Sequence, residues 1–183
     1  MSGSEVPKKL RTFEVLGFDA RGNSGQNYYG ECPFCGKRNK LYVNAETLQW
    51  DCKSCGLEGN IHGFLEKWYE AIQEESEDDK FIPEWDKLSK DRELPVEALQ
   101  RAGLVWDNVD ERWVIPVRNH RGTMVNFRFW RYGQKPKGLP EVDTYLWGAE
   151  RLITRKTAHV YVCEGEWDAV ALDEMIRNAG EDA

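Results

Sequence analysis

Two Cys-x-x-Cys pairs, Cys32 with Cys35 and Cys52 with Cys55, constrain the fold of this 183-residue chain more than any other feature. The sixteen residues 36–51 separate the pairs, a spacing typical of four thiolates that share one tetrahedral zinc ion. Because four cysteines fill the coordination shell, we expect one structural zinc ion with no open position for a substrate. So small a unit buries too little apolar surface to fold unaided, and metal binding would supply its folding free energy.

The residues around these pairs predict a zinc ribbon, a small antiparallel β unit over 28–59. Segments 41–44 and 47–51 lie on either side of a two-residue turn and are typical of two short paired strands. A glycine follows each cysteine pair and suits the tight turn that wraps a metal ligand.

We expect the ribbon to act through the side chains that it displays. Base–aromatic stacking contributes roughly 1–3 kcal/mol per base, and cations contact phosphates. The candidate nucleic-acid contacts on the ribbon are Lys37, Arg38 and Trp50, together with Lys40, Tyr42 and Lys53. The sequence leaves open the alternative that Tyr42 and Trp50 only cover the small core of the hairpin.

Composition divides the first half of the chain into three segments. Residues 1–27 are polar and rich in Gly, Ser and Asn, so we expect a flexible N-terminal segment with one short packed stretch. Within 28–75, the ribbon is followed by a helix that Asn60 caps and that carries apolar residues on one face. The acidic run after it predicts a linker at 76–84, where we place the domain boundary.

Residues 85–158 predict a mixed α/β domain. A helix is expected near 95–102, and a four-residue turn joins strands at 113–118 and 123–131. Basic side chains gather at the end of the second strand and in the loop after it: Arg128, Arg131, Lys135 and Lys137. We interpret them as contacts to phosphates, and the sequence leaves open the alternative of a solvated basic loop.

Residues 159–172 predict a strand, a tight turn and a helix. The apolar, β-branched run at 159–163 is interrupted by Glu164 and Gly165, and apolar residues at helical spacing follow. Asp168 then lies one helical turn beyond Glu164. Because Mg²⁺ binds one or two carboxylates and keeps several waters, we interpret the two acids as a candidate magnesium site. The alternative is that they only favour the helix N-terminus electrostatically.

Charge and hydropathy limit the partners. The formal charge of −7 at pH 7 is uneven: +1 over 1–60, −6 over 61–94, +4 over 95–159 and −6 over 160–183. This pattern allows a polyanion on one surface and a metal ion on another. Since there is no apolar run of about eighteen residues and no apolar N-terminal signal, we expect a cytoplasmic protein without a membrane partner.

Three motifs, taken in order, resemble the DNA primase family of bacteria and bacteriophages: CPFCG…CKSCGLEGNIHGFL, IPVRNHRGTMVNFRFW and CEGEWDAVAL. They cover most of residues 28–175, and the four-cysteine ribbon is closer to the phage members. The resemblance implies a chain of several α+β and α/β units. An N-terminal zinc ribbon would precede a primase-type RNA polymerase domain, whose first subdomain spans 85–158. Residues 159–183 would be the first strand and helix of a TOPRIM, or Rossmann-like, unit.

The resemblance also implies an activity. Members join ribonucleoside triphosphates on a single-stranded DNA template by metal-assisted phosphoryl transfer, and the ribbon helps to select the template trinucleotide. Glu164 matches the family's TOPRIM glutamate and Asp168 the acid four residues later, so both are implied to be catalytic and to bind Mg²⁺. The residues implied to hold template or nucleotide phosphates are Arg128, Arg131, Lys135 and Lys137. A replicative helicase is a further candidate partner, in a bacterial or phage-infected cell.

The chain departs from the family pattern after Gly165. A TOPRIM site also uses an Asp-x-Asp pair on a later strand, and no such pair follows here. We therefore expect a truncated or partial primase with little primer synthesis of its own. One rival interpretation is a non-catalytic primase-derived module that binds single-stranded DNA or a replication protein. Another is a recombination-mediator protein, a family whose ribbon is shorter and lies nearer its TOPRIM region.

Overall fold

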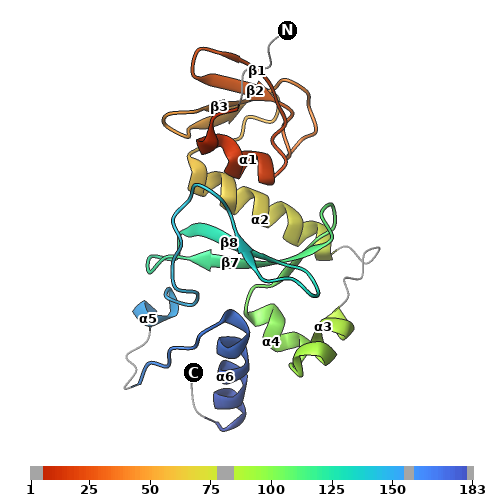
Figure 1. The fold of residues 1–183 in the computed structure, drawn as a ribbon, viewed down its shortest axis with the longest axis vertical. Helices are drawn as coiled ribbons and strands as arrows, with labels where there is room; N and C mark the ends of the chain where they lie inside the picture. The colour runs from red at the N-terminus through yellow and green to blue at the C-terminus, as the bar shows by residue number, and fades with distance from the viewer. Residues whose placement is uncertain (1–5, 78–84, 155–158, 181–183) are drawn as a thin grey trace.

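Two antiparallel β-sheets, with a long helix between them, organise the chain (Figure 1). The computed structural model describes residues 6–77, 85–154 and 159–180. Sheet A has the strand order β1-β2-β3-β4-β5, and sheet B has the order β6-β7-β8-β9. All neighbouring strands in both sheets are antiparallel, so the predicted mixture of helices and antiparallel strands is confirmed.

Sheet A contains the cysteine pairs. Its strands are β1 (Ala20–Ser24), β2 (Asn27–Gly30), β3 (Leu41–Asn44), β4 (Trp50–Cys52) and β5 (Glu58–Gly59). The predicted hairpin is confirmed, since β3 pairs with β4 and places Tyr42 opposite Asp51. The first cysteine pair lies between β2 and β3, and the second begins at the end of β4.

The N-terminal segment is more ordered than its polar composition predicts. A short 3₁₀ turn, η1 (Lys8–Leu10), leads into helix α1 (Arg11–Val15), and β1 then pairs with β2. The apolar side chains of this segment are almost fully buried: Leu10, Phe13, Leu16 and Phe18. The short packed stretch expected within 1–27 therefore lies at residues 8–18, and β1 adds a strand that the sequence did not predict. The physical reason is that the ribbon has little core of its own and gains apolar cover from this segment.

Helix α2 (Ile61–Glu77) follows the ribbon, as the apolar spacing predicts. Asn60 caps it, because its Oδ1 accepts the backbone N–H of Gly63 at 3.0 Å. The helix ends at Glu77 and so occupies the first two residues of the linker expected at 76–84. Residues 78–84 lie outside the described part of the chain.

One hydrophobic core extends from the ribbon through α2 to sheet B. Near the start of the helix, the ring centroids of Phe64 and Trp50 are 5.1 Å apart. One turn further, the ring of Trp68 lies 5.2 Å from that of Phe127 in sheet B. All four side chains belong to a single buried cluster, which crosses the predicted domain boundary. The ribbon is thus packed against sheet B through a shared core.

Helices cover both faces of sheet B (Figure 1). Its strands are β6 (Val105–Asp107), β7 (Arg112–Arg118), β8 (Met124–Trp130) and β9 (Lys137–Gly138). Helix α2 lies on one face. The other face meets α3 (Trp85–Arg92), α4 (Val96–Arg101) and α6 (Glu166–Asn178) through a second core that includes Trp113, Ile115 and Val170. The hairpin predicted for 113–118 and 123–131 is confirmed as β7 and β8, and the helix near 95–102 is α4.

A short helix, α5 (Arg151–Thr154), precedes the C-terminal segment. Among the helices that the structure describes, none is long and apolar enough to cross a membrane.

Residues 159–163 form no β-strand, although their sequence predicts one. Val160, Tyr161 and Val162 are 59%, 62% and 75% exposed. A strand needs a neighbour for its backbone N–H and C=O groups and apolar cover for a face. Sheet B ends at β6 and β9 and does not extend to this segment. Of the predicted strand–turn–helix unit, the described residues contain the turn and helix α6.

Candidate functional site

The four cysteines lie together in the geometry of a zinc site. The Sγ atoms of Cys32, Cys35, Cys52 and Cys55 all lie within 4.8 Å of one another. The Cys35 and Cys52 sulfurs are 3.8 Å apart, close to the edge of about 3.8 Å of a tetrahedron with 2.3 Å Zn–S bonds. Four thiolates at this spacing fit Zn²⁺ and fill its shell. Elsewhere in the described ranges, no three or more His, Cys, Asp or Glu side chains are placed to share an ion.

Tight turns hold each cysteine pair. The N–H of Gly36 donates to the Cys32 carbonyl at 2.8 Å, and the N–H of Gly56 donates to the Cys52 carbonyl at 3.0 Å. Both glycines have positive φ, 64° and 76°, which a residue with a side chain rarely adopts. The two turns therefore share the same hydrogen bond and the same glycine conformation.

The protein itself stabilises a thiolate at Cys52. Burial acts to raise the pKa of this thiol, but the backbone N–H groups of Cys55 and Ser54 offset that effect and bring the pKa to about 7. The Ser54 N–H lies 3.4 Å from the Cys52 sulfur. For Cys32, burial dominates and raises the pKa of the thiol. A metal ion would therefore be needed to hold all four as thiolates near neutral pH.

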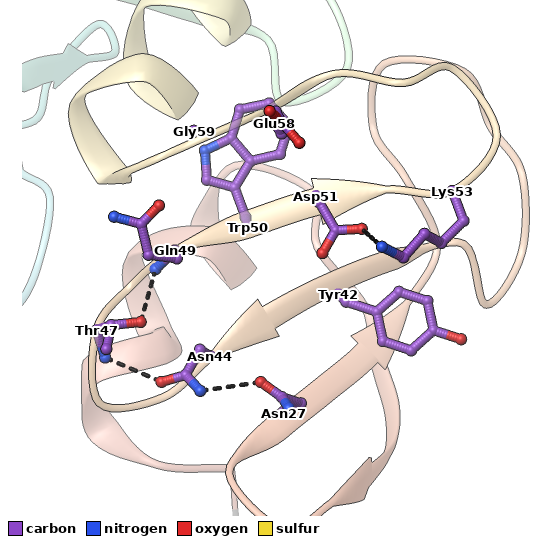
Figure 2. A pocket seen from close by; sticks show the side chains of 10 residues that line it. All are labelled: Asn27, Tyr42, Asn44, Thr47, Gln49, Trp50, Asp51, Lys53, Glu58 and Gly59. Atoms are coloured by element: carbon purple, nitrogen blue, oxygen red, sulfur yellow. Dashed lines mark hydrogen bonds and ion pairs between the residues drawn. The ribbon is translucent and has the colours of Figure 1, made fainter.

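The outer face of sheet A is hollowed into a groove of about 690 Å³ (Figure 2). Strand pairing places Tyr29 opposite Tyr42, and Tyr42 opposite Asp51, along a row across this face. The groove is mostly polar in its lining: Asn27, Tyr42, Asn44, Thr47, Gln49, Trp50, Asp51, Lys53, Glu58 and Gly59. Its size falls within the range of about 300–1,000 Å³ that is common for small-molecule pockets.

Hydrogen bonds and an ion pair order the polar side chains of the groove. The Asn44 Nδ2 atom donates to Asn27 Oδ1 at 2.9 Å. Lys53 Nζ lies 2.6 Å from Asp51 Oδ2, and this carboxylate raises the pKa of Lys53, which stays charged. The face therefore offers amides, a phenol, one ion pair and the exposed carboxylate of Glu58.

The predicted basic contacts of the ribbon lie on its surface. Lys37 is exposed, and the Arg38 side chain is 88% exposed, with its Nε 3.8 Å from the Glu31 carboxylate. Arg38 also lines a second hollow, of about 390 Å³, with Arg21, Glu31 and Asn39. Both cations are exposed to solvent.

Trp50 occupies the core, the alternative that the sequence left open. It is 3% exposed, its Nε1 donates to the Asn60 carbonyl at 2.8 Å, and its ring packs on Phe64. Tyr42, by contrast, is half-buried on the outer face, and its ring centroid lies 6.1 Å from that of Tyr29. Sequence reasoning missed Tyr29. The sequence does not distinguish it from the adjacent Tyr28, because the face of each tyrosine is set only when β2 pairs with β3.

The two predicted catalytic acids lie at the start of α6. Glu164 and Asp168 are both exposed, on either side of Gly165, the N-cap residue. The Asp168 carboxylate folds back toward Gly165, since a Cβ atom at that glycine would lie 3.5 Å from Asp168 Oδ2. This position suits an acid that stabilises a helix N-terminus. The described residues bring no third acid or histidine beside these two, so magnesium binding by Glu164 and Asp168 stays a prediction.

The predicted phosphate contacts of sheet B differ in their surroundings. Arg128 is partly buried: its Nε donates to Glu166 at 3.1 Å and its Nη2 donates to Thr144 at 2.9 Å. Arg131 donates to the Asp110 carbonyl, whereas Lys135 and Lys137 are exposed. The structure thus brings Arg128 beside the first turn of α6, through Glu166, a residue that sequence reasoning missed. The ribbon lies at the opposite end of the molecule from α6 (Figure 1).

No protein-family model and no curated protein matches the chain. Among solved structures, the crystal structure of the Aquifex aeolicus primase (zinc-binding and RNA polymerase domains) is similar at 16% sequence identity and a TM-score of 0.40. The match covers 92% of this chain and 62% of that one, so the chain spans less than two thirds of its neighbour. A likeness this remote does not assign a family or an activity.

Proposed function

We propose that this chain binds single-stranded DNA through its zinc ribbon, as the template-binding part of a DNA primase. The observation that carries the proposal is the four-cysteine cluster, which supports a ribbon whose outer face is hollowed, polar and partly aromatic. The order of the three sequence motifs adds the primase class: ribbon, strand hairpin, then the CEGEWDAVAL segment.

The ribbon has the two components that single-stranded DNA needs. Tyr42 and Tyr29 are half-buried on one face and supply a stacking surface for bases. Lys37 and Arg38 are exposed near the first cysteine pair and are available for phosphates. Cys32, Cys35, Cys52 and Cys55 would hold a zinc ion, which would fix the two cysteine turns and the loop that carries Lys37 and Arg38.

Because the ribbon and sheet B share one core, a DNA strand bound to the ribbon would have a fixed position relative to sheet B. Two contacts at the start and middle of α2 support this: His62 Nδ1 lies 3.0 Å from the Met124 carbonyl, and Glu66 forms a two-point ion pair with Arg118 at 2.8 and 3.0 Å. A template held by the ribbon would therefore lie at a constant distance from the basic side chains of β8 and its following loop.

Primer synthesis is the further part of the proposal. Glu164 and Asp168 would act with Mg²⁺ and ribonucleoside triphosphates, and Lys135 and Lys137 would contact phosphates. Because no Asp-x-Asp pair joins Glu164 and Asp168 in this sequence, the chain by itself should make few or no primers. A primer-synthesis assay with labelled ribonucleotides and a single-stranded template tests this. Synthesis that Glu164→Gln abolishes would show a complete site.

A non-catalytic single-stranded DNA-binding module is the second candidate function. Glu164 and Asp168 at the start of α6 are exposed and have no third acid placed beside them in the described residues, which favours this second function. The same primer-synthesis assay, repeated with added replication proteins such as a helicase, separates the two. A catalytic primase should gain activity in some such mixture, whereas a binding module should gain none.

The binding step has its own test. The zinc-loaded chain should increase the fluorescence anisotropy of a labelled single strand much more than that of the matching duplex, with an affinity that falls steeply as salt rises. Equal weak binding to both, or no binding, would contradict the proposed function.

A further inference from the structure

The turn between β3 and β4 fixes the orientation of one amide in the groove. Asn44 Oδ1 accepts the backbone N–H groups of Glu46 and Thr47, each at 3.0 Å. Since both partners are backbone donors, the atom that faces them must be the carbonyl oxygen and not the amide nitrogen. Asn44 is therefore forced to turn its Nδ2 toward β2.

This constraint passes to Asn27 in β2. Asn44 Nδ2 donates to Asn27 Oδ1 at 2.9 Å, so the Asn27 amide must direct its own nitrogen away from Asn44 (Figure 2). Asn27 is exposed and lines the groove, and its Nδ2 has no hydrogen-bond partner among the residues described. The groove consequently displays an N–H donor whose orientation the neighbouring turn determines.

An aromatic surface lies beside this donor. Tyr29 and Tyr42 are cross-strand neighbours, and each lies two residues from an amide on its own strand, Asn27 or Asn44. Residues two apart on a strand share a face of the sheet. A base stacked on Tyr42 would thus have its edge near Asn27.

We propose that, at one position of the bound strand, the groove prefers the keto bases guanine and thymine over the amino bases adenine and cytosine, and that Asn27 determines this preference. The inference rests on the proposed function. Guanine and thymine carry a carbonyl oxygen, O6 or O4, where adenine and cytosine carry an amino group. A fixed N–H donor bonds the carbonyl, whereas it meets a second donor in the amino group. One neutral hydrogen bond corresponds to a preference of about two- to tenfold.

A base scan tests the inference. A short labelled single strand is varied to G, T, A or C at one position at a time, and the affinity of the zinc-loaded chain is measured by anisotropy. The expected result is one position at which G and T bind about two- to tenfold more tightly than A and C.

Two isosteric variants should reverse the preference. In Asn27→Asp, one oxygen still accepts from Asn44 and the other replaces the outward donor with an acceptor. In Asn44→Asp, the turn keeps its acceptor but Asn27 must flip to donate inward, so its oxygen then faces the groove. If Asn44→Asp reverses the base preference while Asn27 itself is unchanged, the orientation of the Asn27 amide determines that preference. A purely structural role of Asn44 would not reverse it. Asn23→Asp, on exposed β1, adds the same charge to the ribbon and should leave the preference as it is.

The outcomes separate the two proposals. Equal affinity for all four bases at every position overturns the inference and leaves the proposed function intact. A preference that both variants leave unchanged also overturns it. Failure of the zinc-loaded chain to bind any single strand overturns both. If a variant loses its zinc or unfolds, as measured by circular dichroism, the base scan of the unsubstituted chain still tests whether keto bases are preferred.

Discussion

Arg112 Nε donates to the Asp107 carboxylate at 2.8 Å, and both side chains are almost fully buried, at 9% and 4% exposure. The same guanidinium donates to the Val15 carbonyl of α1 and lies over the ring of Phe129, with 3.8 Å between the guanidinium carbon and the ring centroid. One arginine thus ties the N-terminal segment, the β6–β7 turn and the core of sheet B together.

We predict that Arg112→Ala lowers the free energy of unfolding by about 3–5 kcal/mol, because it leaves the Asp107 carboxylate buried without its partner. Urea denaturation followed by tryptophan fluorescence measures the change. Arg121→Ala, which removes an exposed arginine from the β7–β8 turn, is the control and should cost less than about 0.5 kcal/mol. A loss for Arg112→Ala as small as for the control would show that the pair contributes little.

Zinc removal should unfold more than the ribbon. Because Phe64 and Trp68 of α2 share one core with Trp50 and Phe127, loss of the metal should also loosen sheet B. A strong chelator is expected to abolish the near-ultraviolet circular dichroism of the buried tryptophans and to increase binding of an apolar dye. Cys35→Ser should reproduce both effects without chelator. Signals from sheet B that stay unchanged after the metal is removed would argue for two independent units.

Alkaline pH should destabilise the fold through Tyr69. Burial raises the pKa of its phenol to about 12, and the hydroxyl donates to the Gly103 carbonyl at 2.6 Å. Between pH 10 and pH 12 the unfolded chain releases this proton while the folded chain keeps it, so stability falls as pH rises, by up to about 1.4 kcal/mol per pH unit. Comparing urea midpoints of the unsubstituted chain and Tyr69→Phe across this range isolates the effect. Parallel curves for the two proteins would contradict it.

Arg128 should couple to the first turn of α6. Its ion pair with Glu166 is partly buried, at 26% and 20% exposure, so a double-mutant cycle of Arg128→Ala and Glu166→Ala should give a coupling energy of roughly 1 kcal/mol. Thermal denaturation of the four proteins supplies the values. If the two substitutions have additive effects on stability, the ion pair contributes nothing measurable and does not hold Arg128 away from a phosphate.

Local patterns predicted the parts of this fold that local chemistry determines. Cysteine spacing identified the metal cluster, and the alternation around Tyr42 identified the hairpin of β3 and β4. The cap at Asn60 and the apolar spacing after it identified α2. Each of these features depends on residues that are close in the sequence, or on a metal ion that binds cysteines at a characteristic spacing.

Features that depend on distant partners were missed or misjudged. Burial of Phe13 against α2 and the ion pair of Arg128 with Glu166 join residues that no local pattern connects. The sequence left open whether Trp50 is displayed or buried, although Trp50 alternates with Asp51 and shares the buried face of β4 with Cys52. Residues 159–163 have the composition of a buried strand, yet a strand also requires a neighbour, which the described residues do not provide.

The salt dependence of single-stranded DNA binding tests the central claim, that the ribbon holds the strand, most directly. For single strands, the slope of log affinity against log salt falls by about 0.7 for each phosphate contact removed, so Lys37→Ala with Arg38→Ala should reduce it by about 1.4. The control pair, Lys90→Ala with Arg121→Ala, removes two exposed charges outside sheet A and should leave the slope unchanged. Equal slopes for both double variants and the unsubstituted chain would contradict the account.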